Sequence, residues 1–492
     1  MIKKILIANR GEIAVRIIRA CKELGITSVA VYSNEDKLSL HTKLADESYP
    51  LKGSTASETY LNKEKIFSTI EQSGADAIHP GYGFFSENAD FIREAENRNI
   101  IFIGPSADSV LMMGSKTSAR RLMTDHKVPV VPGTLTPLSS LEEGLQESER
   151  IGYPVLLKAA AGGGGKGMRT VFSKDEFISA YDATKREALK SFADDSVYIE
   201  KFILNPRHIE VQVIADKQGN YVHLFERECS IQRRHQKIIE EAPSAFIDSE
   251  TRTKLTQAAI NAAKACRYYN AGTIEFLVDS QKNFYFLEMN TRLQVEHPVT
   301  EFITGIDLVK EQISIANGNK LSFMQEDLKI SGHAIECRVY AEDPSNNFLP
   351  STGTLEHYRQ PAGPGVRVDS GFESGSSVSI YFDPMIAKLI CWTKERKNTI
   401  KVCHRALSEF QIAGVINNIE FLKSLLEDDA YQRNDISINY IEDSFLKNNG
   451  VLKSNDPAET AAAVLASLLK MKKNHKTSIS PSSNKWRDQN YE

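Results

Sequence analysis

Apolar strands and amphipathic helices alternate over residues 4–103, and this alternation limits the fold more than any other feature of the chain. The expected strands are residues 4–8, 28–33, 75–78 and 100–103. The expected helices between them, with apolar residues at helical spacing, are residues 11–24, 58–72 and 86–96. Strands that alternate with helices form βαβ units around a parallel sheet. The sequence therefore predicts an α/β domain at the N-terminus.

Two turns in this region follow strands, where open α/β sheets bind their ligands. The first, residues 8–12 (Ala-Asn-Arg-Gly-Glu), lacks the Gly-x-Gly-x-x-Gly pattern of dinucleotide-binding folds. The second, residues 79–87, is His-Pro-Gly-Tyr-Gly-Phe-Phe-Ser-Glu. Its glycines and aromatic residues suit a pocket wall, and they suit a tight turn with packed aromatic rings equally well.

Composition and length exclude several classes of protein. A chain of 492 residues is long enough for about three domains. A net charge of −4 favours neither nucleic acid nor an anionic membrane as a partner. The chain contains no apolar run long enough to span a bilayer. Its six cysteines include no Cys-x-x-Cys pair, so we expect reduced thiols in a cytoplasmic protein.

Residues 114–169 carry features of a phosphate-binding region. A helix expected at 114–126 has Lys116 near its N-terminus, which attracts anions. Lys158 lies on a strand expected at 155–159, and four consecutive glycines follow at 162–165. Lys166 is followed by glycine and not by Ser or Thr, so this is not a Walker loop. Apolar strands on both sides favour a mobile cover over phosphates, while a flexible linker is the alternative.

Two further stretches suggest a nucleotide pocket. A strand expected at 196–203 ends in Glu200 and Lys201, whose backbone and carboxylate could bind an adenine edge; an interdomain hinge fits as well. Residues 206–215 alternate polar and apolar side chains, as a strand with one polar face does. Residues 233–237 (Arg-Arg-His-Gln-Lys) form a basic cluster framed by apolar residues. The cluster is typical of an anion pocket, and a solvated charged face is its alternative.

An acidic hairpin is the clearest candidate metal site. If residues 280–283 form a four-residue loop, Asp279 lies opposite Phe284 and Glu275 lies opposite Glu288. Like charges that face each other destabilise a sheet, and a divalent cation removes this conflict. Asn290 shares the face of Glu288, and Arg292, Gln294, Glu296 and His297 follow directly. A solvated sheet face with tolerated acids is the alternative for the hairpin alone.

Taken together, these stretches resemble biotin carboxylase, the ATP-grasp component of biotin-dependent carboxylases such as acetyl-CoA, propionyl-CoA and pyruvate carboxylases. The resemblance covers roughly residues 1–447. The motifs that carry it, in chain order, are residues 8–13, 79–84, 162–167, 200–201, 205–208, 233–237, 288–292 and 295–298, with Arg338.

The resemblance implies an α/β and α+β ATP-grasp fold in which a Rossmann-like domain precedes the nucleotide site. It places an N-terminal domain at 1–114, an ATP-grasp domain with a mobile lid at about 130–203 within 115–330, and a C-terminal domain at 331–447. Residues 448–492 change in composition, and we expect a helix followed by a largely disordered tail.

The implied reaction has two steps. ATP phosphorylates bicarbonate to carboxyphosphate, and the CO₂ released from it carboxylates biotin. Glu275, Glu288 and Asn290 would hold two Mg²⁺ or Mn²⁺ ions at the phosphates of ATP. The residues that match the ATP site are Lys116, Lys158, Gly163, Gly164, Gly165, Glu200, Lys201, Ile203, His208, Gln232 and His235.

The resemblance also assigns the reacting groups. Bicarbonate would bind Arg292, Lys237, Gln294 and the backbone of Val295, and Glu296 would accept its proton. Arg338 would stabilise the biotin enolate, with Tyr82 and Gly83 as the biotin-side wall. The catalytic residues implied are Glu296, Arg292, Arg338 and Lys237. Without the family context, a surface ion pair with Glu336 or Asp343 is the better interpretation of Arg338.

The sequence departs from the family pattern at two places. Tyr340 replaces a smaller polar residue of many relatives, and residues 361–364 (Pro-Ala-Gly-Pro) replace an aromatic dimer contact. Arg19 and Glu23 match dimer positions, so a homodimer is expected. The chain has no biotin-accepting Met-Lys-Met motif, so the carrier protein and the carboxyltransferase would be separate subunits. Another ATP-grasp ligase and a non-catalytic nucleotide-binding regulator are the competing functions.

Overall fold

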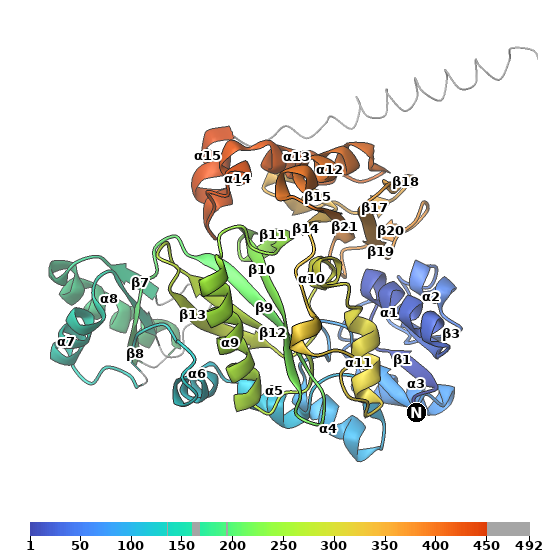
Figure 1. Cartoon of the computed structure of the whole chain (residues 1–492), viewed down its shortest axis with the longest axis horizontal. Helices are drawn as coiled ribbons and strands as arrows, with labels where there is room; N and C mark the ends of the chain where they lie inside the picture. The colour runs from blue at the N-terminus through green and yellow to red at the C-terminus, as the bar shows by residue number, and fades with distance from the viewer. Residues whose placement is uncertain (135, 160–167, 193–194, 450–492) are drawn as a thin grey trace, which may run out of the picture.

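The computed structural model describes residues 1–134, 136–159, 168–192 and 195–449. The N-terminal region lies at the right of Figure 1, and a small unit with helices α7 and α8 lies at the left. A long central sheet lies between them, and its last strands lead into the helices at the top.

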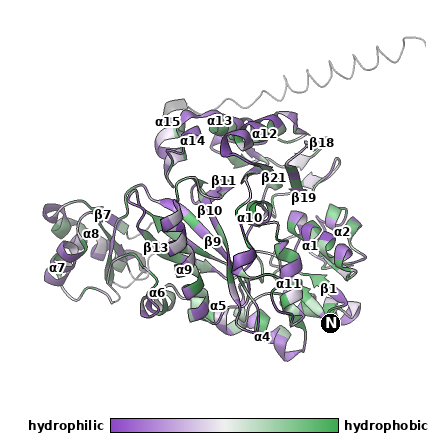
Figure 2. Cartoon of the chain, in the orientation of Figure 1, coloured by the Kyte–Doolittle hydropathy of each residue, from purple (hydrophilic) through white to green (hydrophobic). Residues whose placement is uncertain are grey.

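The first 103 residues form the expected parallel sheet, with strand order β3-β2-β1-β4-β5. Its strands are β1 (Lys4–Ile7), β2 (Thr27–Tyr32), β3 (Glu47–Pro50), β4 (Ala77–His79) and β5 (Ile101–Phe102). Its helices are α1 (Gly11–Leu24), α2 (Leu40–Leu44), α3 (Lys63–Ser73) and α4 (Ala89–Asn97). The buried face of α1 carries Ile13, Ile17 and Ile18, while Arg19, Lys22 and Glu23 are exposed. Figure 2 shows apolar and polar residues together on this helix.

One helix of this region begins later than the sequence predicts. Helix α3 starts at Lys63 and not at residue 58, because Asn62 caps it by accepting a hydrogen bond from the Lys65 amide at 3.0 Å. The Glu58 carboxylate instead accepts hydrogen bonds from the amides of Ser54 and Thr55, at 3.0 and 3.1 Å. The prediction missed β3, a short, half-exposed edge strand of sequence Glu-Ser-Tyr-Pro.

The unit at the left of Figure 1 is an antiparallel sheet of order β7-β6-β8, in which β8 is Val197–Lys201. It packs against α7 (Leu141–Ile151) and α8 (Lys174–Phe192). Strands β6 (Val155–Ala159) and β7 (Met168–Val171) pair with each other, so the two strands predicted on either side of residues 160–167 are confirmed. The glycine-rich stretch itself lies outside the described residues. Helix α6 (Lys116–Asp125) confirms the helix predicted at 114–126, and α5 (Ala107–Gly114), which was not predicted, precedes it.

The central sheet has eight antiparallel strands in the order β13-β12-β9-β10-β11-β14-β21-β19. They are β9 (Arg207–Ala215), β10 (Tyr221–Arg233), β11 (Gln236–Ala242), β12 (Asn270–Val278), β13 (Phe284–Asn290), β14 (His333–Tyr340), β19 (Val366–Ser370) and β21 (Met385–Thr393). Pairing of β11 with β14 continues one sheet across residue 330, where the sequence predicts a domain boundary. Groups from both regions therefore meet on one surface.

The remaining elements surround this sheet. The helices are α9 (Ser249–Ala265), α10 (His297–Thr304), α11 (Leu308–Ala316), α12 (Arg396–Glu409), α13 (Ile419–Glu427), α14 (Asp429–Gln432) and α15 (Leu446–Asn449). Three two-stranded pairs join β15 (Glu342–Asp343) with β16 (Leu349–Pro350), β17 (Gly353–Thr354) with β20 (Ser377–Val378), and β18 (His357–Arg359) with β22 (Gln411–Ala413). Among the described residues, no helix combines the length and the hydrophobicity needed to cross a membrane.

Candidate active site

Four charged residues stand in one row across the central sheet. Arg227 on β10 pairs in register with Glu210 on β9, Glu210 with Glu275 on β12, and Glu275 with Glu288 on β13. The predicted opposition of Glu275 and Glu288 is confirmed. The row also places a third carboxylate, that of Glu210, beside Glu275. Glu210 lies on β9, outside the hairpin, so the hairpin pattern could not predict it.

The predicted register at the turn of this hairpin is wrong. Phe284 pairs with Val278 and not with Asp279, whose carboxylate accepts hydrogen bonds from the turn amides of Gln281 and Asn283, each at 2.9 Å. The register shifts by one residue between Glu275 and Phe276, and Leu287 is the residue left unpaired. This bulge brings Glu288 back opposite Glu275.

The ammonium group of Lys237 holds three buried carboxylates together. Its Nζ donates to Glu210 Oε2 at 2.6 Å, Glu296 Oε1 at 2.6 Å and Glu275 Oε1 at 3.1 Å. Burial alone would lower the pKa of Lys237, but the three carboxylates raise it well above its ordinary value. Burial likewise opposes ionisation of Glu275, yet Lys237 and His208 hold the pKa of Glu275 below its usual range. The cluster is therefore a network of charged groups at neutral pH.

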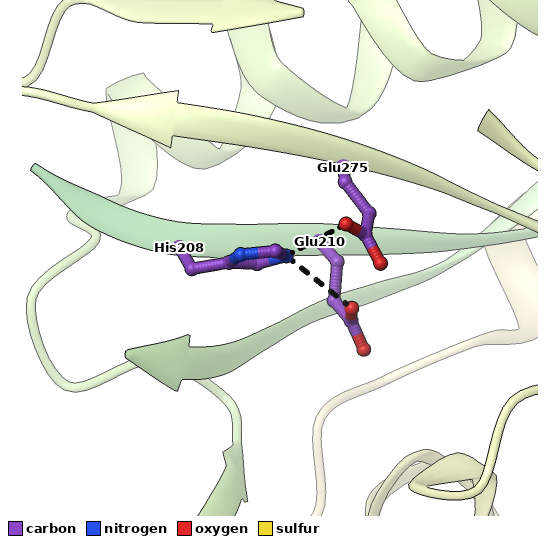
Figure 3. A group of neighbouring side chains, drawn as sticks. All are labelled: His208, Glu210 and Glu275. Atoms are coloured by element: carbon purple, nitrogen blue, oxygen red, sulfur yellow. Dashed lines mark ion pairs between the residues drawn. The ribbon is translucent and has the colours of Figure 1, made fainter. Parts of the chain in front are cut away.

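Figure 3 shows His208 pointing from β9 toward two of these carboxylates. Its Nε2 lies 3.0 Å from Glu275 Oε2 and 3.9 Å from Glu210 Oε2. These three side chains are close enough to hold a metal ion. Glu210 is already engaged by Lys237 and by Arg227 Nε at 2.5 Å, so an ion here would displace cations that the fold provides.

Glu275, Glu288 and Asn290 suit a hard divalent cation better. All three offer oxygen atoms, and Glu288 is exposed in a pocket whose lining also contains Asn290. Asn290 donates from Nδ2 to Glu275 Oε1 at 2.8 Å, which turns its own oxygen toward Arg292 Nη2, also at 2.8 Å. The donor set fits Mg²⁺ or Mn²⁺.

The loop after β13 is fixed by residues from other elements. The Glu87 carboxylate, in the predicted pocket-wall turn, accepts from Arg292 Nε at 2.8 Å and from the Thr291 amide at 2.9 Å. Gln294 donates to Glu275 Oε1 at 2.8 Å and accepts from Arg227 Nη2 at 2.7 Å. The side chains of Arg292 and Gln294 are therefore oriented in advance.

Glu296 lies between two cations, immediately before α10. Lys237 binds one of its oxygens, and Arg338 Nη2 donates to the other at 2.9 Å. Arg338 Nε also donates to Glu240 Oε1 at 2.6 Å. Burial opposes ionisation of Glu296, but Lys237, Arg338 and Arg227 hold its pKa well below the ordinary value. Arg338 is buried, so the surface ion pair with Glu336 or Asp343 is wrong.

Arg338 and Arg292 also line a pocket of about 570 Å³, together with Tyr82, Gly83 and Val295. The turn that carries Tyr82 is fixed by Asn9, whose Nδ2 donates to the carbonyls of Pro80 at 2.6 Å and Tyr82 at 2.7 Å. A side chain at Gly81 would meet Asn9 Nδ2 at 2.9 Å, which explains the glycine there. Tyr340, the departure noted in the sequence, lines the same pocket.

A second pocket, of about 390 Å³, lies at the start of the loop that follows β13. Its lining includes Lys158, Glu200, Glu288, Asn290 and Glu87. Lys158 forms an ion pair with Glu200, whose other oxygen accepts from Arg120 Nη1 at 2.5 Å.

Five other predicted ATP-binding residues, whose side chains the structure describes, do not line this pocket: Lys201, Ile203, His208, Gln232 and His235. Lys201 Nζ donates to the carbonyls of Gly152 and Tyr153, and Gln232 Nε2 lies 3.0 Å from His208 Nδ1. Ile203 is half-buried after β8, and His235 is exposed in the turn between β10 and β11. Lys116 begins α6, and Gly163, Gly164 and Gly165 lie outside the described residues.

Sequence reasoning missed several residues that shape this site, among them Glu210, Arg227, Glu87, Arg120 and Glu240. Arg227 is the most telling, because it is fully buried and donates hydrogen bonds to Glu210, Gln212, Thr273, Gln294 and Thr300. The one available signal was the alternation of polar residues on residues 206–215 beside the charged stretch that begins at Glu226.

Comparison with known proteins agrees with this geometry. Residues 1–110 match the family model "Biotin carboxylase, N-terminal domain", and residues 336–443 match "Biotin carboxylase C-terminal domain". Residues 115–324 match "Carbamoyl-phosphate synthase L chain, ATP binding domain".

Individual relatives cover nearly the same region. The chain is 51% identical to "Biotin carboxylase 1" of Bacillus subtilis over 90% of this chain and 98% of the relative. The biotin carboxylase of Campylobacter jejuni, solved as a β,γ-ATP complex, is 48% identical with a TM-score of 0.82, covering 90% of this chain and 98% of that one. The biotin carboxylase domain dimer of Hydrogenobacter thermophilus 2-oxoglutarate carboxylase, solved with MgADP, ADP and bicarbonate, is 45% identical with a TM-score of 0.81, covering 91% of this chain and 98% of that one. The chain belongs to the biotin carboxylase family and has its ATP-grasp fold.

Proposed function

We propose that this protein carboxylates biotin, carried on a partner protein, at the expense of ATP and bicarbonate. The observation that carries the proposal is the position of Glu296, whose two oxygens are held by Lys237 and Arg338. Glu296 is the last residue of the loop between β13 and α10, and Lys237 and Arg338 reach it from β11 and β14. A base flanked by two cations suits a small anion that must both bind and lose a proton.

ATP would lie with its phosphates in the 390 Å³ pocket. Lys158 would leave Glu200 and neutralise phosphate charge, while Glu275, Glu288 and Asn290 would hold the divalent cation. A divalent cation held by these residues would supply the positive charge that offsets the negative charge developing during phosphoryl transfer. Lys237 and His208 keep Glu275 ionised, and Asn290, which lines the pocket, donates to its Oε1.

Bicarbonate would bind next to Arg292, Gln294 and Lys237. Arg292 lies between the two pockets and is already oriented by Glu87 and Asn290. A bound anion would compete with Glu296 for Lys237 and Arg338, and the pKa of Glu296 would rise from its depressed value. The Glu296 carboxylate would then be able to accept the proton of bicarbonate while bicarbonate attacks the terminal phosphate of ATP.

The biotin ring would occupy the 570 Å³ pocket beside Tyr82 and Gly83. Arg338 is buried, permanently charged and directed along the pocket wall, so it can stabilise the enolate oxygen of the ring. Loss of the ring N–H proton, which the phosphate released with CO₂ from carboxyphosphate can accept, forms that enolate and makes the ring nitrogen nucleophilic toward CO₂. Tyr340 narrows this pocket and would affect how the ring fits.

The proposal extends to partners and domain limits. Biotin carboxylases work with a carrier and a carboxyltransferase, and we propose both as partners of this chain. A homodimer would use the surface of α1 near Arg19 and Glu23, which line a hollow of about 360 Å³ together with Arg16 and Arg367. We propose domain limits near residues 114 and 330, although β11 and β14 pair across the second limit.

One assay tests the proposal. ATP hydrolysis is measured with and without Mg²⁺, bicarbonate and free biotin. We expect turnover to require both Mg²⁺ and bicarbonate and to rise when biotin is added. Bicarbonate-dependent turnover without any response to biotin would indicate another ATP-grasp ligase, and nucleotide binding without turnover would indicate a regulator.

A further inference from the structure

Lys388 is a fully buried lysine of β21 at which three regions of the chain meet. Its Nζ lies 3.3 Å from Glu12 Oε1, on α1 of the N-terminal domain, and 3.9 Å from Asp369 Oδ2, on the neighbouring strand β19. It also donates a hydrogen bond of 2.7 Å to the carbonyl oxygen of Val295, in the loop that carries the reacting groups. None of the sequence motifs pointed to this residue.

The hydrogen bond to Val295 acts on the backbone of Glu296. The Val295 carbonyl and the Glu296 amide belong to the same planar peptide unit, so a donor that fixes one fixes the other. Glu296 has no side-chain cap at the start of α10. Lys388 therefore determines the point from which the Glu296 side chain extends between Lys237 and Arg338.

The preceding carbonyl is held in a similar way. His297 Nδ1 lies 2.8 Å from the carbonyl oxygen of Gln294. Burial and the nearby cations Lys388, Arg16 and Arg367 keep the pKa of His297 well below its ordinary value, so its ring is neutral and donates from Nδ1. Two successive carbonyls of the loop, those of Gln294 and Val295, are thus bound by buried basic side chains.

A buried ammonium is costly, and the fold provides carboxylates to offset that cost. Glu12, Glu336 and Asp369 surround Lys388, and they hold its pKa above the ordinary value although burial acts to lower it. Among the described residues, neither oxygen of Glu12 or Glu336 has a hydrogen-bond partner. The ammonium group of Lys388 thus donates its hydrogen bond to the Val295 carbonyl and not to Glu12 or Glu336.

We propose that Lys388 is a positioning residue for the carboxylation reaction, which holds the Val295–Glu296 peptide so that Glu296 reaches the proton of bicarbonate. The inference rests on the proposed function. Its competitor is a purely structural role, in which Lys388 only stabilises the buried acids Glu12, Glu336 and Asp369 that surround it. The two roles predict different kinetics for a variant that loses both Lys388 and an acid beside it. A structural role predicts normal bicarbonate kinetics in that variant, and a positioning role predicts a defect, because the hydrogen bond to the Val295 carbonyl is still missing.

Three variants separate these roles. Lys388→Met removes both the charge and the donor. Glu12→Gln/Lys388→Met also removes the acid nearest to Lys388, whose pKa burial raises to about 7, and it leaves the Val295 carbonyl without its donor. Arg396→Met is the matched control, because it removes a half-buried cation of the C-terminal domain, whose carboxylate partner is Glu241 on β11 and not a residue of the loop at 292–296. For each variant, the measurements are thermal stability and the kcat and KM of Mg²⁺-dependent ATP hydrolysis for bicarbonate and for ATP.

We expect Lys388→Met to lower kcat/KM for bicarbonate on the order of 10²-fold, the effect of misplacing a reacting group by about 1 Å, with little change in the KM for ATP. We expect the double variant to regain thermal stability while keeping the bicarbonate defect. Arg396→Met is expected to lose stability and retain its bicarbonate kinetics.

Recovery of both stability and bicarbonate kcat/KM in the double variant would overturn the proposal, as would equal losses for ATP and bicarbonate. If Lys388→Met does not fold, the double variant carries the test by itself. Failure of the proposed function looks different, because the unmodified protein would then show no bicarbonate-dependent hydrolysis.

Discussion

Arg338 and Glu296 are joined by a hydrogen bond of 2.9 Å, although one lies on β14 and the other in the loop before α10. The same guanidinium donates to Glu240 on β11. Burial raises the pKa of Glu240 to about 7, against the opposing effect of Arg338. Arg338 is thus fixed between a firmly ionised base and a carboxyl that is easily protonated, and its charge remains available to a ligand.

Arg338→Gln is expected to separate the two half-steps of the reaction. Formation of carboxybiotin should fall roughly 10²–10³-fold, the usual loss when one donor to a developing oxyanion is removed. ATP affinity should change little, because Arg338 lines the 570 Å³ pocket and not the one with Lys158. The measurements are carboxybiotin formation and the Kd of ATP.

Arg233→Gln is the matched control for this variant. Arg233 is also buried and also pairs with a carboxylate, Glu342, at 2.7 Å, but it does not line either pocket in the described structure. A large loss of ATP affinity in Arg338→Gln, or equal losses of carboxybiotin formation in both variants, would contradict the assignment.

Glu288→Gln is expected to raise the Mg²⁺ concentration needed for half-maximal ATP hydrolysis by about 10–100-fold, as a weakened metal site does. Glu288 is exposed, so the melting temperature should stay within about 1 °C of the unmodified protein. The measurement is an Mg²⁺ titration at saturating ATP. Glu356→Gln, another exposed glutamate, is the control, and an unchanged titration in Glu288→Gln would exclude it as a ligand.

Arg227→Met is expected to destabilise the fold by roughly 3–5 kcal/mol, because it leaves the buried Glu210 without one of its cations. It also removes the donor that orients Gln294, so bicarbonate kinetics should suffer in the protein that remains folded. Urea unfolding measures the first effect and ATP hydrolysis the second. A variant as stable as the unmodified protein would show that Lys237 alone compensates the charge of Glu210.

Glu87→Gln tests how Arg292 is held. The variant keeps an oxygen that can accept from Arg292 or from the Thr291 amide, but it loses the charge that attracts the guanidinium. We expect the KM for bicarbonate to rise about 3–10-fold, with the KM for ATP unchanged. Glu94→Gln, in α4 of the same domain, is the control, and equal effects of the two changes would exclude a role for Glu87 in bicarbonate binding.

The parallel sheet and the acidic hairpin could be predicted from the sequence because both are local patterns. Glu275 and Glu288 are separated by one turn, and the alternation of side chains in strands limits which residues can face each other. Even there the predicted register at the turn was wrong. A bulge at Leu287 keeps the two acids opposite each other, and the residue types at this position do not predict a bulge.

The partners of buried charges could not be predicted because they are distant in sequence. Arg338 binds Glu240, 98 residues before it, and Glu296, 42 residues before it, while the sequence offered Glu336 and Asp343 nearby. Neither Lys388 nor Arg227 belongs to a motif, and only the order of the eight strands shows that their charges meet the loop at 292–296. The spacing of residues within a motif predicts which side chains bind the substrates. It does not predict the distant side chains that orient them.

Stability at acidic pH should depend on Glu241. This buried carboxylate accepts hydrogen bonds from Arg396 Nε at 2.6 Å and lies 2.7 Å from His333 Nε2. Burial alone would raise its pKa, but Arg396 and His333 lower it from 4.5 to about 2. A carboxyl whose pKa is lower in the folded state stabilises the protein above the unfolded pKa, and this stabilisation is lost as the pH falls through the folded pKa.

Glu241→Gln should therefore be less stable than the unmodified protein by roughly 3 kcal/mol at pH 7, and the difference should shrink as the pH falls from about 5 toward 2. The measurement is the free energy of urea unfolding for both proteins at several pH values in this range. Glu356→Gln, exposed in the same domain, should show no such convergence. A stability difference that stays constant with pH would mean that Glu241 is not held ionised by Arg396 and His333, and that the variant loses only packing.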